Sequence, residues 1–228
     1  MIPRALFLDF DGLICDTERA ARRSWDETWA QHGVVFPDEL WERMEGRADG
    51  EDLALDALSA ALDRPLGAGV RDARASRKRR LSASEPLRPG VGRLLALARR
   101  CGLPMAVVSS SPAAWVEGHL ARLEVRDHFA VVVTRETAER HKPAPDLYLA
   151  ALARMGVAPF EAEALEDSAV GVRAARSAGL RCVAVPASGG AAKRVTEADL
   201  VVADFEEYLR QAAWTDVDER QRENRWAG

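Results

Sequence analysis

The feature that most constrains this chain is a stretch near its start in which two aspartates follow an apolar segment. Residues 5–8 (Ala-Leu-Phe-Leu) have the length and character of a buried strand, and Asp9 and Asp11 come directly after it, followed by Gly12. In an open parallel sheet, ligands bind at the carboxyl ends of the strands. Two carboxylates there supply half of a hard-cation site, and one of them can act as a nucleophile. Taken alone, Asp-Phe-Asp-Gly is equally typical of a simple turn.

The rest of the chain predicts an α/β fold. Residues 18–84 contain no convincing strand, and their apolar spacing indicates successive helices. After Gly90, helices and short apolar strands alternate, which is typical of a parallel sheet with helices on both faces and right-handed crossovers. We therefore predict a Rossmann-like, doubly wound parallel sheet with an inserted all-helical domain. The expected core comprises residues 1–17 and 86–210, the insertion residues 18–85, and a polar tail residues 211–228.

Composition excludes several classes of protein. The formal net charge of -4 argues against a general nucleic-acid binder, because such proteins are usually basic. The apolar runs are too short to span a membrane, and the first residues lead into a strand rather than a signal peptide. The three cysteines, Cys15, Cys101 and Cys182, are far apart and lack metal-type spacing, as expected for reduced thiols of a cytoplasmic protein. We expect a monomer with no nucleic-acid or membrane partner.

Three further strand ends carry polar side chains. Ser109 follows the apolar segment 105–108, and its hydroxyl suits a phosphate oxygen. Lys142 precedes two prolines, where its charge can serve a phosphate or a nucleophilic carboxylate. Glu166 and Asp167 end the segment 162–165. Each of these residues also has a plainer interpretation. Ser109 or the nearby Ser111 could cap the next helix, which is the interpretation we prefer for Ser111. Lys142 could be a solvated loop residue, and Glu166 and Asp167 could stabilise the start of the helix that follows them.

Together these residues resemble the four motifs of the haloacid dehalogenase superfamily. The matching features are Asp9-x-Asp11-Gly12, Ser109 after an apolar strand, Lys142-Pro143-x-Pro145-Asp146, and Glu166-Asp167-Ser168-x-x-Gly171. They occur in the family's order and spacing, and the resemblance covers about residues 4–210. It is closest to the phosphatases and β-phosphoglucomutases whose helical cap lies between the first two motifs. Asp11 and Asp167 favour phosphoryl transfer over dehalogenation, since dehalogenases need no metal and lack the second aspartate.

The resemblance implies a role for each matching residue. Asp9 would be the nucleophile that forms an aspartyl-phosphate, and Asp11 would protonate the leaving oxygen and then activate water. Mg²⁺ would be held by Asp9, the backbone carbonyl of Asp11 and Asp167, with support from Glu166. Ser109, Ser110 and Lys142 would bind the transferring phosphoryl group of a small phosphorylated metabolite.

The family contains both phosphatases and mutases, and two departures favour hydrolysis here. Mutases carry a histidine ten residues after the acid/base, which is Ala21 in this chain. They also place an arginine three residues after a cap-loop glycine; counting from Gly46 gives Asp49, although Arg47 is close. Gly46, Arg47 and Asp49 are the residues of the insertion that we expect to contact the substrate. A second class of alternative is a phosphate-binding regulatory module without turnover, which would not require Asp11.

A basic run from Arg71 to Arg80, which includes Arg77-Lys78-Arg79-Arg80, lies in the last predicted helix of the insertion. It could face the site and attract an acidic substrate. A solvated helix face is the more common explanation for such a run, and we prefer it.

Overall fold

The computed structural model describes residues 3–44, 50–187 and 195–212. The chain folds as two compact units, one made of Met1–Cys15 and Leu87–Gly228 and the other of Asp16–Pro86. Unit 1 contains a six-stranded parallel sheet with the order β3-β2-β1-β4-β5-β6. The strands are β1 (Ala5–Leu8), β2 (Met105–Val108), β3 (Val131–Val133), β4 (Ala162–Glu166), β5 (Arg181–Ala184) and β6 (Leu200–Val201). The predicted α/β fold, with a helical insertion after the first strand, is confirmed.

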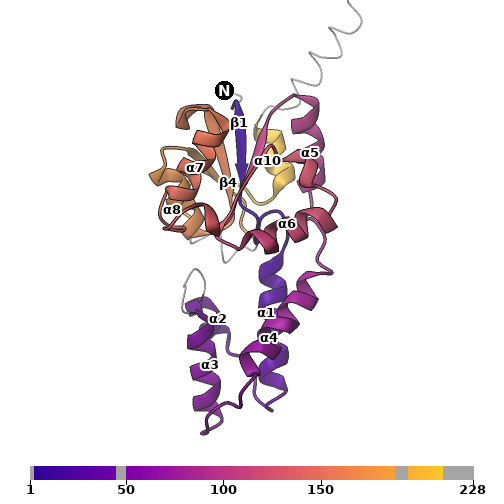
Figure 1. The fold of residues 1–228 in the computed structure, drawn as a ribbon, viewed down its shortest axis with the longest axis vertical. Helices are drawn as coiled ribbons and strands as arrows, with labels where there is room; N and C mark the ends of the chain where they lie inside the picture. The colour runs from indigo at the N-terminus through magenta and orange to yellow at the C-terminus, as the bar shows by residue number, and fades with distance from the viewer. Residues whose placement is uncertain (1–2, 45–49, 188–194, 213–228) are drawn as a thin grey trace, which may run out of the picture. The chain divides into compact units, whose positions relative to one another are not determined.

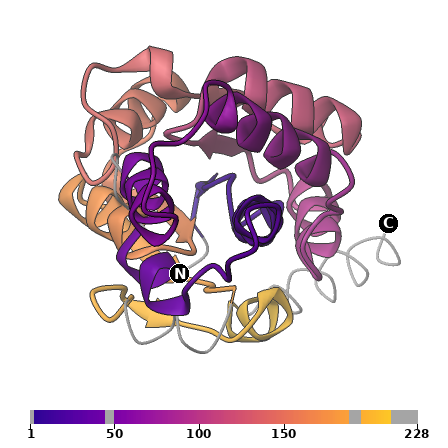
Figure 2. The same ribbon diagram turned by 90° about the horizontal axis from the view of Figure 1, so that it is seen from below.

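Helices cover both faces of the sheet because successive strand residues point to opposite sides. Leu6 and Leu8 pack with one layer of helices, and Ala5 and Phe7 pack with the other. The first layer consists of α5 (Val91–Arg100), α6 (Ala113–Arg122) and α10 (Phe205–Gln211), and the second of α7 (Asp146–Met155) and α8 (Ala169–Ser177). Figure 1 and, from below, Figure 2 show α7 and α8 on one side of the strands and α5 and α10 on the other.

The chain leaves and re-enters unit 1 at one place. Cys15 forms an isolated antiparallel bridge with Leu87, and the backbone N–H of Arg88 donates to the carbonyl of Ile14 at 2.9 Å. The Arg88 guanidinium also donates to three backbone carbonyls of unit 1, those of Gly12 (2.7 Å), Val185 (2.9 Å) and Pro186 (3.2 Å). The two crossing segments are thereby tied to each other and to the loop that carries Asp11.

In its described residues (16–44 and 50–86), unit 2 contains four helices: α1 (Thr17–Ala30), α2 (Asp38–Met44), α3 (Gly50–Ala61) and α4 (Val70–Ser82). Its own apolar cluster is centred on Trp25, Trp29, Phe36 and Leu58. The carboxylate of Asp16 begins α1 by accepting from the backbone N–H of Arg19 at 3.0 Å.

The basic run of α4 is not simply a solvated face, so our preferred interpretation of it is wrong for Arg77. Arg77 is buried; it donates to Thr28 Oγ1 at 2.7 Å and pairs with Glu27 at 3.3 Å, both on α1. Three residues earlier, Arg74 is also buried, and its guanidinium lies 4.4 Å from the Trp25 ring centroid. This spacing puts both arginines on the face that packs against α1, whereas Arg79 and Arg80 are exposed.

Candidate active site

Asp9 is a buried carboxylate at the end of β1, joined by a lysine to a second buried acid. Lys142 Nζ lies 2.5 Å from Asp9 Oδ1 and 2.6 Å from Glu166 Oε1, at the end of β4, and donates to the Val108 carbonyl at 2.8 Å. Only 5% of the lysine side chain is exposed, so the solvated loop lysine considered above is wrong. All three protons of the ammonium group are used in these contacts.

Burial and pairing shift the pKa values of this group. Burial raises the pKa of Asp9 to about 8; Lys142 opposes this shift, while Glu166 and Asp11 add to it. Burial lowers the pKa of Lys142, but Asp9 and Glu166 outweigh that effect and raise it above the ordinary value. Lys142 is therefore firmly cationic. A second cation next to Asp9 would favour its ionised, nucleophilic form.

The acids at these strand ends fit a hard cation. Asp9, Glu166 and Asp167 each offer a carboxylate oxygen, and these oxygens lie within 4.8 Å of one another. Glu166 is fully buried, and its Oε2 atom has no hydrogen-bond partner. An unpartnered buried carboxylate oxygen is costly unless a cation or water completes it. An all-oxygen set with excess negative charge is the donor chemistry that Mg²⁺ prefers.

Two residues that sequence reasoning did not assign hold Glu166 in place. The Tyr148 hydroxyl, on α7, donates to Glu166 Oε1 at 2.5 Å, and its ring stacks on Phe7 of β1. Gly171 in α8 leaves room for the carboxylate: a Cβ atom there would lie 1.8 Å from Oε2. The glycine belongs to the sequence motif, but only the structure gives the reason for it.

Asp11 makes contacts that the sequence did not indicate. Its Oδ1 accepts from the indole Nε1–H of Trp115 at 2.9 Å, and its Oδ2 accepts from the Ser111 hydroxyl at 2.6 Å. Ser109, which is almost fully buried, lies farther away, with its hydroxyl 3.4 Å from Oδ2. The tryptophan gave no signal in the sequence beyond its place in the first turn of α6.

The expected helix cap at Ser111 is wrong. The N-cap position of α6 is Pro112, which makes no side-chain cap, and the backbone N–H of Ala113 donates instead to the carboxylate of Glu136, at 3.0 and 3.2 Å. Glu136 comes from a separate turn of 3₁₀ helix, Arg135–Thr137. Because this carboxylate satisfies the helix start, the Ser111 hydroxyl is available to Asp11.

The structure thus brings most of the predicted residues to the carboxyl ends of the strands. Asp9, Glu166 and Asp167 form the acidic cluster with Lys142 between two of them, and the Ser110 hydroxyl accepts from the Lys142 backbone N–H at 3.3 Å. Asp11 and Ser109 meet through the contact described above. The predicted substrate contacts Gly46, Arg47 and Asp49 lie outside the described residues.

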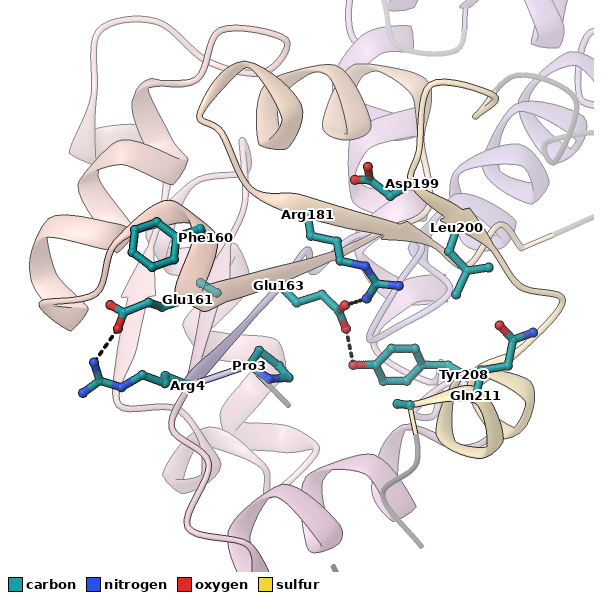
Figure 3. Close-up of a pocket in the computed structure, with 12 residues that line it drawn as sticks. Pro3, Arg4, Phe160, Glu161, Glu163, Arg181, Asp199, Leu200, Tyr208 and Gln211 are labelled. Atoms are coloured by element: carbon teal, nitrogen blue, oxygen red, sulfur yellow. Dashed lines mark hydrogen bonds and ion pairs between the residues drawn. The ribbon is translucent and has the colours of Figure 1, made fainter. Parts of the chain in front are cut away.

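A separate hollow of about 640 Å³ lies at the opposite, amino ends of the strands (Figure 3). Its charged side chains are largely paired with one another: Arg4 with Glu161, and Arg181 with the buried Glu163, which also accepts from Tyr208 at 2.6 Å. This internal pairing offers no excess charge to a phosphorylated ligand.

In the described part of the chain, no helix is both long and apolar enough to cross a membrane.

Comparisons with known proteins bear on what this arrangement does. A family model described as "haloacid dehalogenase-like hydrolase" matches residues 3–179. The chain is 39% identical to YhcW of Bacillus subtilis over 184 residues, covering 80% of this chain and 83% of that protein. It is 34% identical to the fructose-1-phosphate phosphatase YqaB of Escherichia coli over 182 residues, covering 79% and 95%. A crystal structure of CbbY from Rhodobacter sphaeroides, in complex with xylulose-(1,5)bisphosphate, matches with a TM-score of 0.71, 30% identity and coverage of 90% and 96%.

Proposed function

Because the chain belongs to the haloacid dehalogenase-like hydrolases, we propose that it is a Mg²⁺-dependent phosphatase that hydrolyses a small phosphorylated metabolite through an aspartyl-phosphate on Asp9. The observation that carries the proposal is the buried Asp9–Lys142–Glu166 group beside Asp167. It combines a nucleophilic carboxylate, a fixed cation and the donor set for a second cation.

The reaction has two displacements at phosphorus. An Asp9 carboxylate oxygen forms the new bond to phosphorus while the bond to the leaving oxygen breaks, and Asp11 gives that oxygen its proton. Water then attacks the phosphorus of the aspartyl-phosphate and gives a proton to Asp11. This step breaks the bond between Asp9 and phosphorus, so inorganic phosphate leaves and Asp9 is regenerated. Asp9, Asp167, Glu166 and the Asp11 carbonyl would hold Mg²⁺, which offsets charge repulsion when bound. Ser109 and Ser110 would bind the phosphoryl oxygens, and the positive charge of Lys142 would stabilise them.

Phosphorylated sugars are the proposed substrate class. YqaB is named for fructose 1-phosphate, and the CbbY structure contains a sugar bisphosphate. Ala21, which stands where the related mutases carry a histidine, is a buried residue of α1 without a proton to exchange. This favours hydrolysis over transfer between two hydroxyls of one sugar. The assignment of unit 2 as a cap, with Gly46, Arg47 and Asp49 reading the substrate, stays a prediction.

Phosphate release from a panel of phosphorylated sugars, nucleotides and organic acids, with and without Mg²⁺, tests the proposal. We expect release from one or more sugar phosphates that requires Mg²⁺ and stops with excess chelator. Full activity in chelator would exclude the metal assignment. No release from any ester would instead favour the phosphate-binding module.

A further inference from the structure

We propose that Trp115 is a positioning residue that, together with Ser111, clamps the carboxylate of Asp11 for proton transfer. The inference rests on the proposed function, in which Asp11 exchanges the proton with the leaving group. The two donors bind different oxygens of the carboxylate, Trp115 at Oδ1 (2.9 Å) and Ser111 at Oδ2 (2.6 Å). Contacts to both oxygens prevent rotation of the carboxylate plane, which a single contact would permit.

Trp115 is itself held by the face of α6 on which it lies. Its ring meets that of His119, one turn later, edge-on at a centroid distance of 4.3 Å, and the buried His119 ring also packs near Phe10. His119 Nδ1 accepts from Arg122 Nε at 2.9 Å, and Arg122 also contacts Cys15 Sγ at 3.4 Å. Residues 115, 119 and 122 lie on one face of α6. The side chains that orient the indole therefore also contact Phe10, before Asp11 in the chain, and Cys15, after it.

The loop that carries Asp11 is also closed on itself. Asp11 forms an isolated bridge with Cys15, and the Gly12 N–H donates to the Cys15 carbonyl at 2.8 Å. On the other side, Glu136 satisfies the start of α6 and leaves Ser111 for Asp11. The backbone and both carboxylate oxygens of Asp11 are thus fixed from separate elements. Proton transfer is sensitive to misplacement of this kind, since a shift of about 1 Å can cost about 100-fold in rate.

The test replaces only the indole N–H. Trp115→Phe removes the donor but also changes packing against His119, so a second variant carries 3-benzothienylalanine at position 115, which keeps the ring shape and substitutes sulfur for N–H. The substrates are p-nitrophenyl phosphate, whose leaving group departs without a proton, and phenyl phosphate, which needs one. Because kcat/KM reports the steps up to departure of the leaving group, it isolates the proton donation by Asp11.

We expect kcat/KM for phenyl phosphate to fall about 10- to 100-fold in the benzothienyl variant, with less than about threefold change for p-nitrophenyl phosphate. Ser111→Ala should show the same pattern. Glu117→Ala is the matched control, because Glu117 lies on α6 as Trp115 does, but its carboxylate makes a half-buried ion pair with Arg126 of the following 3₁₀ turn (Arg126–His128), so the variant should change neither substrate. Equal losses on both phosphates, or none on either, would overturn the positioning role.

A spectroscopic measurement tests the clamp independently of turnover. In a ¹⁵N-indole NMR spectrum, the Trp115 resonance, assigned by its loss in Trp115→Phe, should move upfield in Asp11→Ala as the hydrogen bond to the carboxylate is lost. A resonance that does not respond would overturn the clamp even in an active enzyme. Wild-type protein that releases phosphate neither from these two esters nor from any member of the panel of phosphorylated sugars, nucleotides and organic acids would overturn the proposed function instead.

Discussion

Gly171→Ala should destabilise the protein, although it replaces a helical glycine with the best helix former. The new methyl carbon would lie 1.8 Å from Glu166 Oε2, 2.1 Å from its Cδ and 2.5 Å from its Oε1. The carboxylate has little freedom to move away, because Glu166 is fully buried and its Oε1 is bonded to Lys142 and Tyr148. Either the start of α8 shifts or Glu166 gives up these hydrogen bonds.

Two opposing effects set the magnitude. Helix propensity favours alanine over glycine by about 1 kcal/mol. Overpacking a core costs about 1–3 kcal/mol, and losing a hydrogen bond to a charged group costs about 1.5–3 kcal/mol. The steric cost exceeds the gain in helix propensity, and we expect a net loss of about 1–3 kcal/mol in the free energy of unfolding. The same displacement moves Glu166 Oε2, so the affinity for the proposed Mg²⁺ ion should fall as well.

Urea unfolding followed by circular dichroism measures the change, with Gly118→Ala as the matched control. Gly118 is an exposed glycine within α6, and a Cβ atom there would meet nothing within 4 Å. That variant should gain up to about 1 kcal/mol from propensity alone. In a Glu166→Ala background the penalty of Gly171→Ala should largely vanish. The reasoning is refuted if Gly171→Ala stabilises the protein as Gly118→Ala does, or if its effect adds independently to that of Glu166→Ala.

Three further predictions concern other contacts. Asp9→Asn should reduce kcat by roughly 10⁴- to 10⁶-fold, the scale expected when a nucleophile is removed, with an unchanged circular dichroism spectrum; near-normal turnover would exclude covalent catalysis through Asp9. Tyr148→Phe keeps the ring but loses the donor to Glu166, so urea unfolding should show a loss of about 2 kcal/mol, and unchanged stability would contradict the importance of that bond. Arg77→Ala should lower the free energy of unfolding, measured with urea, by about 2 kcal/mol, because Arg77 is buried against α1. Arg80→Ala, which changes an exposed residue of the same helix, should change it by less than about 0.5 kcal/mol. Equal effects would show that burial of Arg77 against α1 contributes nothing to stability.

The sequence predicted the parts of this site that depend on where strands end. Asp9 and Ser109 follow apolar segments and Glu166 ends one, and parallel pairing brings such residues to one edge of the sheet without further information. The predicted apolar segments 5–8, 105–108 and 162–165 agree with β1, β2 and β4 to within one residue, because buried parallel strands appear as short, nearly continuous apolar runs.

The contacts that the sequence did not predict depend on a second segment distant in the chain. Ser111 is a typical capping residue at a typical position before a helix. In the structure, however, Glu136 of the 3₁₀ turn Arg135–Thr137 accepts from the first N–H of the helix, and Ser111 donates to Asp11 instead. Arg77 looks like one of several surface cations until α1 supplies Glu27 and Thr28. Local propensity describes what a residue prefers in isolation, whereas these side chains are placed by a tertiary neighbour.

The bridge between Cys15 and Leu87, with Arg88 tied to the same loop, has a consequence for how such a chain could have been assembled. From the standpoint of the sheet, the whole of Asp16–Pro86 is one closed loop whose two ends already lie side by side. The entropy of closing a loop grows only logarithmically, by about 0.6 kcal/mol for each doubling of its length. Replacing this segment with a shorter or longer one should therefore change the folding free energy of unit 1 only slightly. The junction is thus a site at which inserted domains of different length can be exchanged without changing the sheet.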